Sequence, residues 1–131
     1  MRSLVLDASA GVELLLDTST GRRLQELLPA DAQWWVPEHF YAEVAGALRR
    51  AELRSTVPPA LVATAMAALG TAPLRRVQVR PLLAEAWGKR NNSTIADALY
   101  VVLAEHLHAD LVTTDMKLAH APGLSVQTIH P

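Results

Sequence analysis

The sequence contains no cysteine among its 131 residues, which excludes disulfide bonds and thiolate metal sites. It also lacks an excess of either charge, with 12 Lys and Arg against 13 Asp and Glu. A formal net charge of -1 excludes the overall basic character of proteins that coat nucleic acid, so any RNA or DNA contact must be local. No apolar run approaches the roughly 20 residues of a membrane-spanning helix. We therefore expect no membrane segment.

The length and composition are those of a globular protein. Half of the residues are hydrophobic and 19% are charged, which separates the chain from disordered sequences. This length supports one sizeable core, so we expect residues 1–131 to form a single domain. A strand-like run begins at Ser3, which leaves no room for a charged leader before an apolar segment. With neither leader nor cysteine, we expect a cytoplasmic protein.

Short apolar runs alternate along the chain with segments of helical periodicity. Strands are predicted at residues 3–7, 33–36, 74–79, 109–115 and 125–129. Helices are predicted at residues 12–16, 21–28, 39–54, 59–69, 81–89, 94–107 and 116–119. This alternation predicts an α/β fold around a mostly parallel sheet. Ser9 is a candidate N-cap for the first helix, and Asn91, Asn92 and Ser93 are candidates for the helix at 94–107.

The predicted helix at 94–107 is apolar on almost every side from Thr94 to Ala104, which is typical of a buried helix. One full charge lies inside this stretch, at Asp97. A buried carboxylate without a partner costs several kcal/mol, so it must be hydrogen-bonded, protonated or bound to a cation. Other carboxylates of the chain are therefore candidates to share a cation with Asp97.

Three further carboxylates are candidates for the same site. Asp7 and Asp115 each end a predicted apolar strand, and Glu43 flanks the apolar face of the helix at 39–54. Ligands of open parallel sheets bind beyond the carboxyl ends of the strands. Carboxylates brought close together repel unless a divalent cation neutralises them, and an all-oxygen site suits Mg²⁺ or Mn²⁺. The pattern therefore predicts a magnesium or manganese site.

Such an ion acts as a Lewis acid in phosphodiester hydrolysis, because it binds a phosphate oxygen and lowers the pKa of an attacking water. Ser9 and Thr113, together with Thr114, are candidates to hold a carboxylate or a water of the site in place.

Each carboxylate also has a structural interpretation. Asp7 and Asp115 are candidate caps for the helices that follow them. Glu43 alone reads as a solvated helix charge, and Asp97 lies near a helix N-terminus, where the helix dipole favours negative charge. The order of the four, strand end, helix, helix and strand end, is more specific than any one of them.

With these motifs in place, the chain resembles PIN-domain proteins, and specifically the VapC-type toxin ribonucleases of bacterial toxin–antitoxin pairs. Residues 4–9 resemble the opening strand of the family with its first acidic residue, and residues 37–48 resemble the second motif, with Glu43 as the acidic residue. Residues 97–104 resemble the third motif. Residues 111–119 resemble the last, with Thr113 and Asp115 as its threonine-x-aspartate pair. The resemblance covers nearly the whole chain.

The resemblance implies a three-layer α/β/α sandwich and an endoribonuclease toxin that cleaves RNA with Mg²⁺ or Mn²⁺. It implies that Asp7, Glu43, Asp97 and Asp115 hold one or two divalent ions. It also implies a homodimer and a small VapB-like antitoxin that occludes the site. One position departs from the pattern, since many relatives carry Asn where this chain has Gly46, and the missing amide bears on substrate choice.

Several basic residues lie close to these motifs. Arg49 and Arg50 follow the Glu43 motif, and Lys117 follows Asp115 by two residues. They are candidate contacts for RNA phosphates. The two arginines are equally well explained as a solvated helix end, and Lys117 as one half of a structural salt bridge.

Two other functions are open from the sequence. One is a catalytically silent PIN scaffold that acts by binding a partner, although such a scaffold has no need of four converging charges. The other is an aspartyl-phosphate protein, a class that also places an Asp at the end of a strand. Asp7, Ala8 and Ser9 lack the second aspartate of the phosphatase pattern, which argues against that class.

Overall fold

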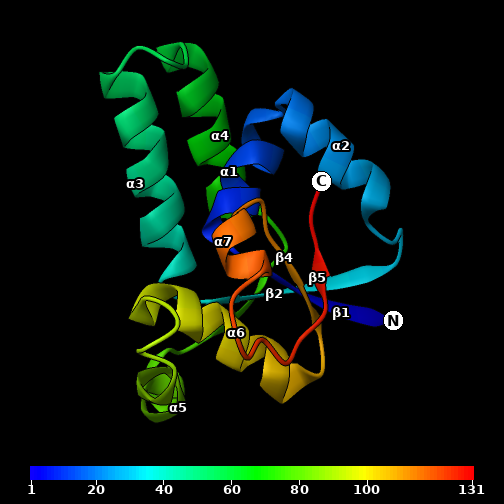
Figure 1. Cartoon of the computed structure of the whole chain (residues 1–131). Coiled ribbons are helices and arrows are strands. Elements are labelled where there is room, and N and C mark those ends of the chain that lie inside the picture. The colour runs from blue at the N-terminus through cyan, green and yellow to red at the C-terminus, as the bar shows by residue number, and fades with distance from the viewer.

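The computed structural model describes all 131 residues as an alternation of strands and helices (Figure 1). The strands are β1 (Arg2–Leu6), β2 (Ala32–Pro37), β3 (Arg75–Val77), β4 (Asp110–Val112) and β5 (Thr128–Ile129). The helices are α1 (Ala8–Leu16), α2 (Ser19–Leu27), α3 (Phe40–Leu53), α4 (Pro59–Thr71), α5 (Leu83–Gly88), α6 (Ile95–Leu107) and α7 (Met116–Ala119), with a 3₁₀ turn at Arg80–Leu82. All the predicted elements are present, with shifted ends.

The five strands form one sheet in the order β3-β2-β1-β4-β5, and every neighbouring pair is parallel. The helices cover both faces: α1 to α4 lie on one side of the strands in Figure 1, and α5 and α6 on the other. Helix α6 packs against β1, β2 and β4. The predicted α/β/α sandwich around a parallel sheet is confirmed.

One cluster of 25 buried hydrophobic residues fills the space between the sheet and the helices. Strand β1 contributes Leu4, Val5 and Leu6, which are continuously apolar because helices cover both faces of a parallel sheet. Helix α6 is buried without interruption from Ala98 to Ala104, as its apolar sequence predicts. The core therefore fixes the start of α6 against the end of β1.

For two helices the observed N-cap differs from a candidate that the sequence offered. Asp7, rather than Ser9, is the N-cap of α1, because the Asp7 carboxylate accepts the Ala10 amide at 3.1 Å. Thr94, rather than Asn91, Asn92 or Ser93, is the N-cap of α6, and its hydroxyl accepts the Asp97 amide at 3.1 Å. Asp7 is itself one of the four predicted acidic residues, and Thr94 bonds the amide of another, Asp97.

The last two strands are shorter than predicted. Beyond Val112, the Thr114 amide donates to the Ser9 hydroxyl and the Asp115 amide to the Thr113 hydroxyl, so the backbone leaves the sheet before Asp115. The predicted strand at 125–129 is reduced to Thr128–Ile129, which pairs with β4.

Helices α3 and α4 pack against each other as an antiparallel pair that extends away from the sheet (Figure 1). None of the helices has both the length and the apolar character that crossing a membrane would need.

Candidate active site

The order of the strands brings two predicted acidic residues together. Strands β2 and β3 lie on one side of β1, and β4 and β5 lie on the other. The order in which the chain adds parallel strands to the sheet therefore reverses between β1 and β4. Ligands of open α/β sheets bind in the crevice that forms at such a reversal, beyond the carboxyl ends of the strands. Asp7 follows β1 directly and Asp115 follows β4 after two residues.

All four predicted carboxylates, Asp7, Glu43, Asp97 and Asp115, line one open cleft at this position. Ser9, Arg50 and Tyr100 line the same cleft. Glu43 comes from α3 and Asp97 from the first turn of α6, which begins beside the end of β1. We call this feature the acidic cleft.

Asp7 is the buried member of the set, with only 3% of its surface exposed. Its two carboxylate oxygens accept separate hydrogen bonds of 2.7 Å, one from the Ser9 hydroxyl and one from the Thr113 hydroxyl. Burial raises the pKa of Asp7, and the charge of Asp97 adds to the rise, whereas the hydrogen bonds of Ser9, Thr113 and the Ala10 amide lower it. The carboxylate is therefore fixed in position.

The same hydroxyls orient the loop that carries Asp115. The Thr113 hydroxyl accepts the Asp115 amide at 3.0 Å, and the Ser9 hydroxyl accepts the Thr114 amide at 3.1 Å. Asp115 then caps α7, because one of its oxygens accepts the Lys117 and Leu118 amides. The structural interpretation of Asp7 and Asp115 as caps is thus confirmed, and each still presents oxygen to the cleft.

Asp97 is less buried than the sequence predicts. It occupies the first turn of α6, before the fully buried stretch begins at Ala98, and its surface is partly exposed to the cleft. Partial burial is the largest cause of the raised pKa of Asp97, and the charges of Asp115 and Glu43 raise it further. A hydrogen bond with the Thr94 side chain opposes this rise. The negative charges of the site therefore act on one another.

Two residues at Glu43 were missed by the sequence analysis. The Tyr100 hydroxyl donates to Glu43 Oε1 at 2.6 Å, and burial together with this bond raises the pKa of Tyr100 far above its ordinary value. His39 Nε2 lies 3.5 Å from the same oxygen and donates to the Ala96 carbonyl at 3.0 Å. The helical spacing of the sequence could have indicated both residues, because Tyr100 is three residues from Asp97 and His39 is four residues from Glu43.

The three candidate RNA contacts occupy different places. Arg50 lines the acidic cleft. Lys117 lines an adjoining recess with Asp97 and Asp115, and its ammonium has no carboxylate within 4.0 Å, so it is not half of a salt bridge here. Arg49 is exposed on α3 and lines neither feature.

The residues of the cleft have the chemistry of a site for a hard divalent cation, with carboxylate and hydroxyl oxygens and no sulfur. Burial is the main cause of the raised pKa values of Asp7 and Asp97, and the charges of neighbouring carboxylates add to both. A bound cation relieves the repulsion between these charges. As the side chains stand, no three acidic or histidine groups are arranged to hold a metal ion. Holding an ion would therefore require some of these carboxylates to move closer together.

Comparison with known proteins gives a consistent family. The model of the PIN domain family matches residues 4–124. Ribonuclease VapC12 of Mycobacterium tuberculosis is 37% identical over 120 residues, which cover 92% of each chain. Ribonuclease VapC3 of the same organism is 40% identical over 118 residues, which cover 90% of this chain and 86% of that one.

Solved structures share the fold at lower identity. VapC20 of M. tuberculosis, described as a Sarcin-Ricin loop cleaving toxin, has a TM-score of 0.70 at 16% identity and covers 98% of this chain and 99% of its own. A toxin–antitoxin complex from Klebsiella pneumoniae has a TM-score of 0.62 at 11% identity and covers 92% of each chain.

Proposed function

Because the chain belongs to the PIN domain family, we propose that it is a metal-dependent endoribonuclease and the toxin of a toxin–antitoxin pair. We also propose that residues 1–131 form a single domain. The observation that carries it is the meeting of Asp7, Glu43, Asp97 and Asp115 in one cleft beyond the ends of β1 and β4. The sequence relatives named as ribonucleases support the choice of RNA.

The four carboxylates would hold Mg²⁺ or Mn²⁺, which supplies Lewis-acid activation of a phosphate and of a water nucleophile when it is bound. Asp7 is presented in a fixed orientation by Ser9 and Thr113, so it loses little side-chain freedom on binding a cation. Tyr100 holds Glu43 in the same way from α6. The protein thereby pre-organises two of its four acidic groups.

Substrate binding in this proposal depends on local cations, since the chain as a whole is weakly acidic. Arg50 at the acidic cleft and Lys117 at the adjoining recess are placed to pair with phosphates of a strand that crosses the carboxylates. RNA and a cognate inhibitor meet such an enzyme in the cytoplasm, which is where we propose that it acts.

We further propose a VapB-like antitoxin as its partner. A toxin–antitoxin complex among the structures of the same fold supports this role. Exposed apolar side chains on the α3–α4 pair, Leu53, Leu61 and Met66, offer a surface for an apolar segment of such an inhibitor. A homodimer is the second proposed assembly, for which Leu83 and Trp87 are exposed on α5.

The test is cleavage of labelled total bacterial RNA by purified antitoxin-free protein, with Mg²⁺, with Mn²⁺ and with EDTA. Discrete products that disappear with EDTA and with Asp97→Ala are expected. A folded wild-type protein that cleaves nothing, and that binds no Mn²⁺ at millimolar concentration by calorimetry, would favour the catalytically silent scaffold instead.

A further inference from the structure

His39 lies where α3 and α6 approach each other at the acidic cleft. It is the N-cap residue of α3, but its side chain makes no capping hydrogen bond. Its backbone carbonyl accepts the Glu43 amide at 3.1 Å, so its main chain belongs to the first turn that carries Glu43. Its side chain is therefore free to contact α6, whose first turn carries Asp97.

The imidazole of His39 contacts both helices. Nε2 donates to the carbonyl of Ala96, the residue before Asp97, at 3.0 Å. The ring packs against that of Tyr100, with 4.7 Å between the centroids. Nε2 also lies 3.5 Å from Glu43 Oε1, the oxygen that accepts the Tyr100 hydroxyl. One side chain thus reaches the surroundings of two of the four carboxylates.

The first turn of α6 has no other polar tie to a neighbouring element. The Thr94 hydroxyl accepts the Asp97 amide, and the Thr94 carbonyl accepts the Ala98 amide, so both bonds stay inside the turn. Of residues 94–98, the Ala96 carbonyl is the only group hydrogen-bonded to another element, and its partner there is His39.

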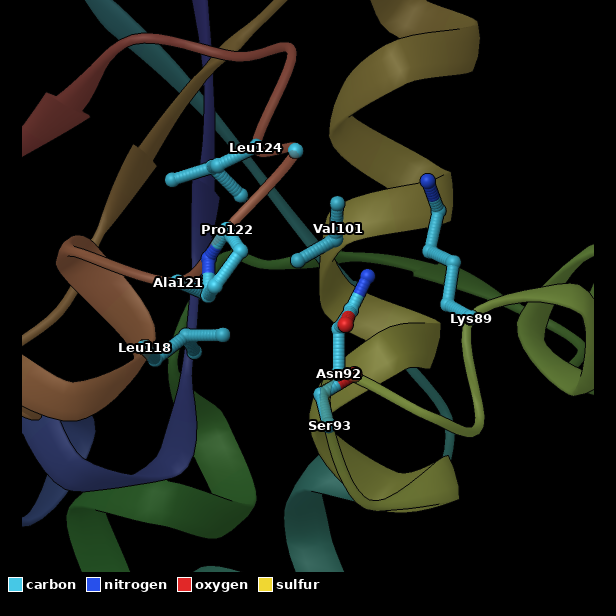
Figure 2. A pocket seen from close by; sticks show the side chains of 9 residues that line it. Lys89, Asn92, Ser93, Val101, Leu118, Ala121, Pro122 and Leu124 are labelled. Carbon is cyan, nitrogen blue, oxygen red and sulfur yellow. The ribbon is translucent and has the colours of Figure 1, made fainter.

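The loop before α6 does not supply such a tie either. The amides of Asn92 and Ser93 both donate to the Lys89 carbonyl, which bonds the loop to itself. In Figure 2, the side chains of Asn92 and Ser93 lie across a small hollow from Leu118. The polar contact that fixes the start of α6 therefore comes from α3.

The other ring nitrogen of His39 has a cost. Nδ1 is buried and has no hydrogen-bond partner. It is an acceptor in the neutral ring and a donor in the imidazolium, so it is unpaired in both forms. A buried unpaired polar atom lowers stability, and a phenylalanine ring would pack against Tyr100 without this cost. A function of the Nε2–H bond beyond packing accounts for a histidine at this position.

We propose that His39 is a positioning residue of the acidic cleft, and that its bond to the Ala96 carbonyl fixes the separation of Asp97 from Glu43. This inference rests on the proposed ribonuclease function, because a shared cation requires a defined separation of its ligands. The charge of Glu43 acts on Asp97, so the two carboxylates repel each other. A fixed contact between α3 and the first turn of α6 opposes that repulsion before a cation binds.

Three substitutions of His39 separate the bond from packing. His39→Phe removes both nitrogens and keeps a ring against Tyr100. His39→Gln keeps an N–H at the reach of Nε2, whereas the shorter amide of His39→Asn lies near Nδ1 and does not reach the Ala96 carbonyl. His106→Phe is the matched control, because His106 Nε2 also joins two helices, through Glu85 at 2.7 Å, but lies outside the acidic cleft.

The first measurement does not depend on cleavage or on a metal ion. Hydrogen exchange of the Asp97 and Ala98 amides is followed by NMR in EDTA. His39→Phe and His39→Asn are expected to speed this exchange by roughly three- to tenfold, with His39→Gln close to wild type. The Tm of His39→Phe should not fall, because the unpaired Nδ1 is removed together with the bond. Wild-type exchange at both amides in His39→Phe would overturn the proposal.

The second measurement is kcat/KM for RNA cleavage, together with Mn²⁺ affinity by calorimetry. His39→Phe and His39→Asn are expected to lower both by roughly tenfold, His39→Gln to restore most of the loss, and His106→Phe to change neither. Faster exchange with unchanged cleavage and Mn²⁺ affinity would reject the positioning role and leave the ribonuclease standing. A wild type that cleaves no RNA and binds no Mn²⁺ would reject the ribonuclease, while faster exchange in His39→Phe would still show that His39 holds the first turn of α6.

Discussion

Tyr100 Oη donates a hydrogen bond to Glu43 Oε1 over 2.6 Å, although the two residues are 57 positions apart in the sequence. The bond connects α6 to α3 across the acidic cleft. Because the pKa of Tyr100 is raised, its hydroxyl stays protonated and remains a donor throughout the physiological pH range. Tyr100 is therefore a positioning residue for Glu43.

Tyr100→Phe is expected to lower kcat/KM for RNA by about tenfold or more, because a hydrogen bond to a charged group contributes about 1.5–3 kcal/mol. The same change should weaken Mn²⁺ binding in calorimetry, since Glu43 then has to be immobilised by the ion. Tyr41→Phe is the control, since Tyr41 is the other tyrosine and does not line the cleft. Equal effects of the two changes would contradict a positioning role.

The four carboxylates could be predicted because each stands at a place that the sequence marks, either after an apolar run or inside a helical pattern. Their mutual contacts could not. Ser9 reads as a helix cap, but the cap is Asp7 and the Ser9 hydroxyl instead bonds Asp7 and the Thr114 amide. From the sequence, Tyr100 is one more apolar position of α6, because its hydrogen-bond partner, Glu43, is distant in the sequence.

The sequence also could not predict which of the carboxylates are buried. The apolar surroundings of Asp97 predict a buried charge, but its place in the first turn of α6 keeps it partly exposed. Asp7 is the buried one, at the end of a strand that packs against α6, while the sequence shows only a strand followed by a turn.

Arg50 and Arg49 are adjacent on α3 but differ in position, which allows a matched comparison. Only Arg50 lines the acidic cleft. Arg50→Ala is therefore expected to weaken binding of single-stranded RNA and to reduce the slope of log affinity against log salt by about one. Arg49→Ala should change neither quantity appreciably. Fluorescence anisotropy of labelled RNA over a series of salt concentrations, with EDTA present, measures both.

Asp97→Asn tests the electrostatic cost of the cleft. The pKa of Asp97 is raised in the folded protein by burial and by the charges of Asp115 and Glu43, so the fold favours the protonated form. The resulting cost is absent below the unfolded pKa near 3.8 and is complete once the pH exceeds the folded pKa. In EDTA, Asp97→Asn is therefore expected to have a higher Tm than wild type at pH 7.5, and the gain should shrink toward pH 4.

The control for this series is Asp31→Asn, an exposed carboxylate outside the cleft, which should show no such pH-dependent gain. Adding Mg²⁺ at pH 7.5 should raise the Tm of wild type more than that of Asp97→Asn, because an ion that binds only the folded state stabilises it. A lower Tm for Asp97→Asn than for wild type in EDTA at pH 7.5 would contradict this electrostatic account.

Thr94 determines both where α6 begins and where Asp97 stands. Its hydroxyl accepts the Asp97 amide, so Thr94→Ala should cost about 1 kcal/mol of the free energy of unfolding, while Thr94→Ser should restore most of it. Thr64→Ala on α4 is the control, because that exposed hydroxyl only bonds the Ala60 carbonyl within its own helix. Urea unfolding followed by circular dichroism measures the difference.

The cap also links stability to activity. Loss of the cap frees the first turn of α6, and Asp97 lies in that turn, so Thr94→Ala should reduce the rate of RNA cleavage as well as stability. Thr64→Ala should affect neither appreciably. If Thr94→Ala lost stability with an unchanged cleavage rate, the position of Asp97 would have to be set by the buried part of α6, from Ala98 onward, and the cap would be purely structural.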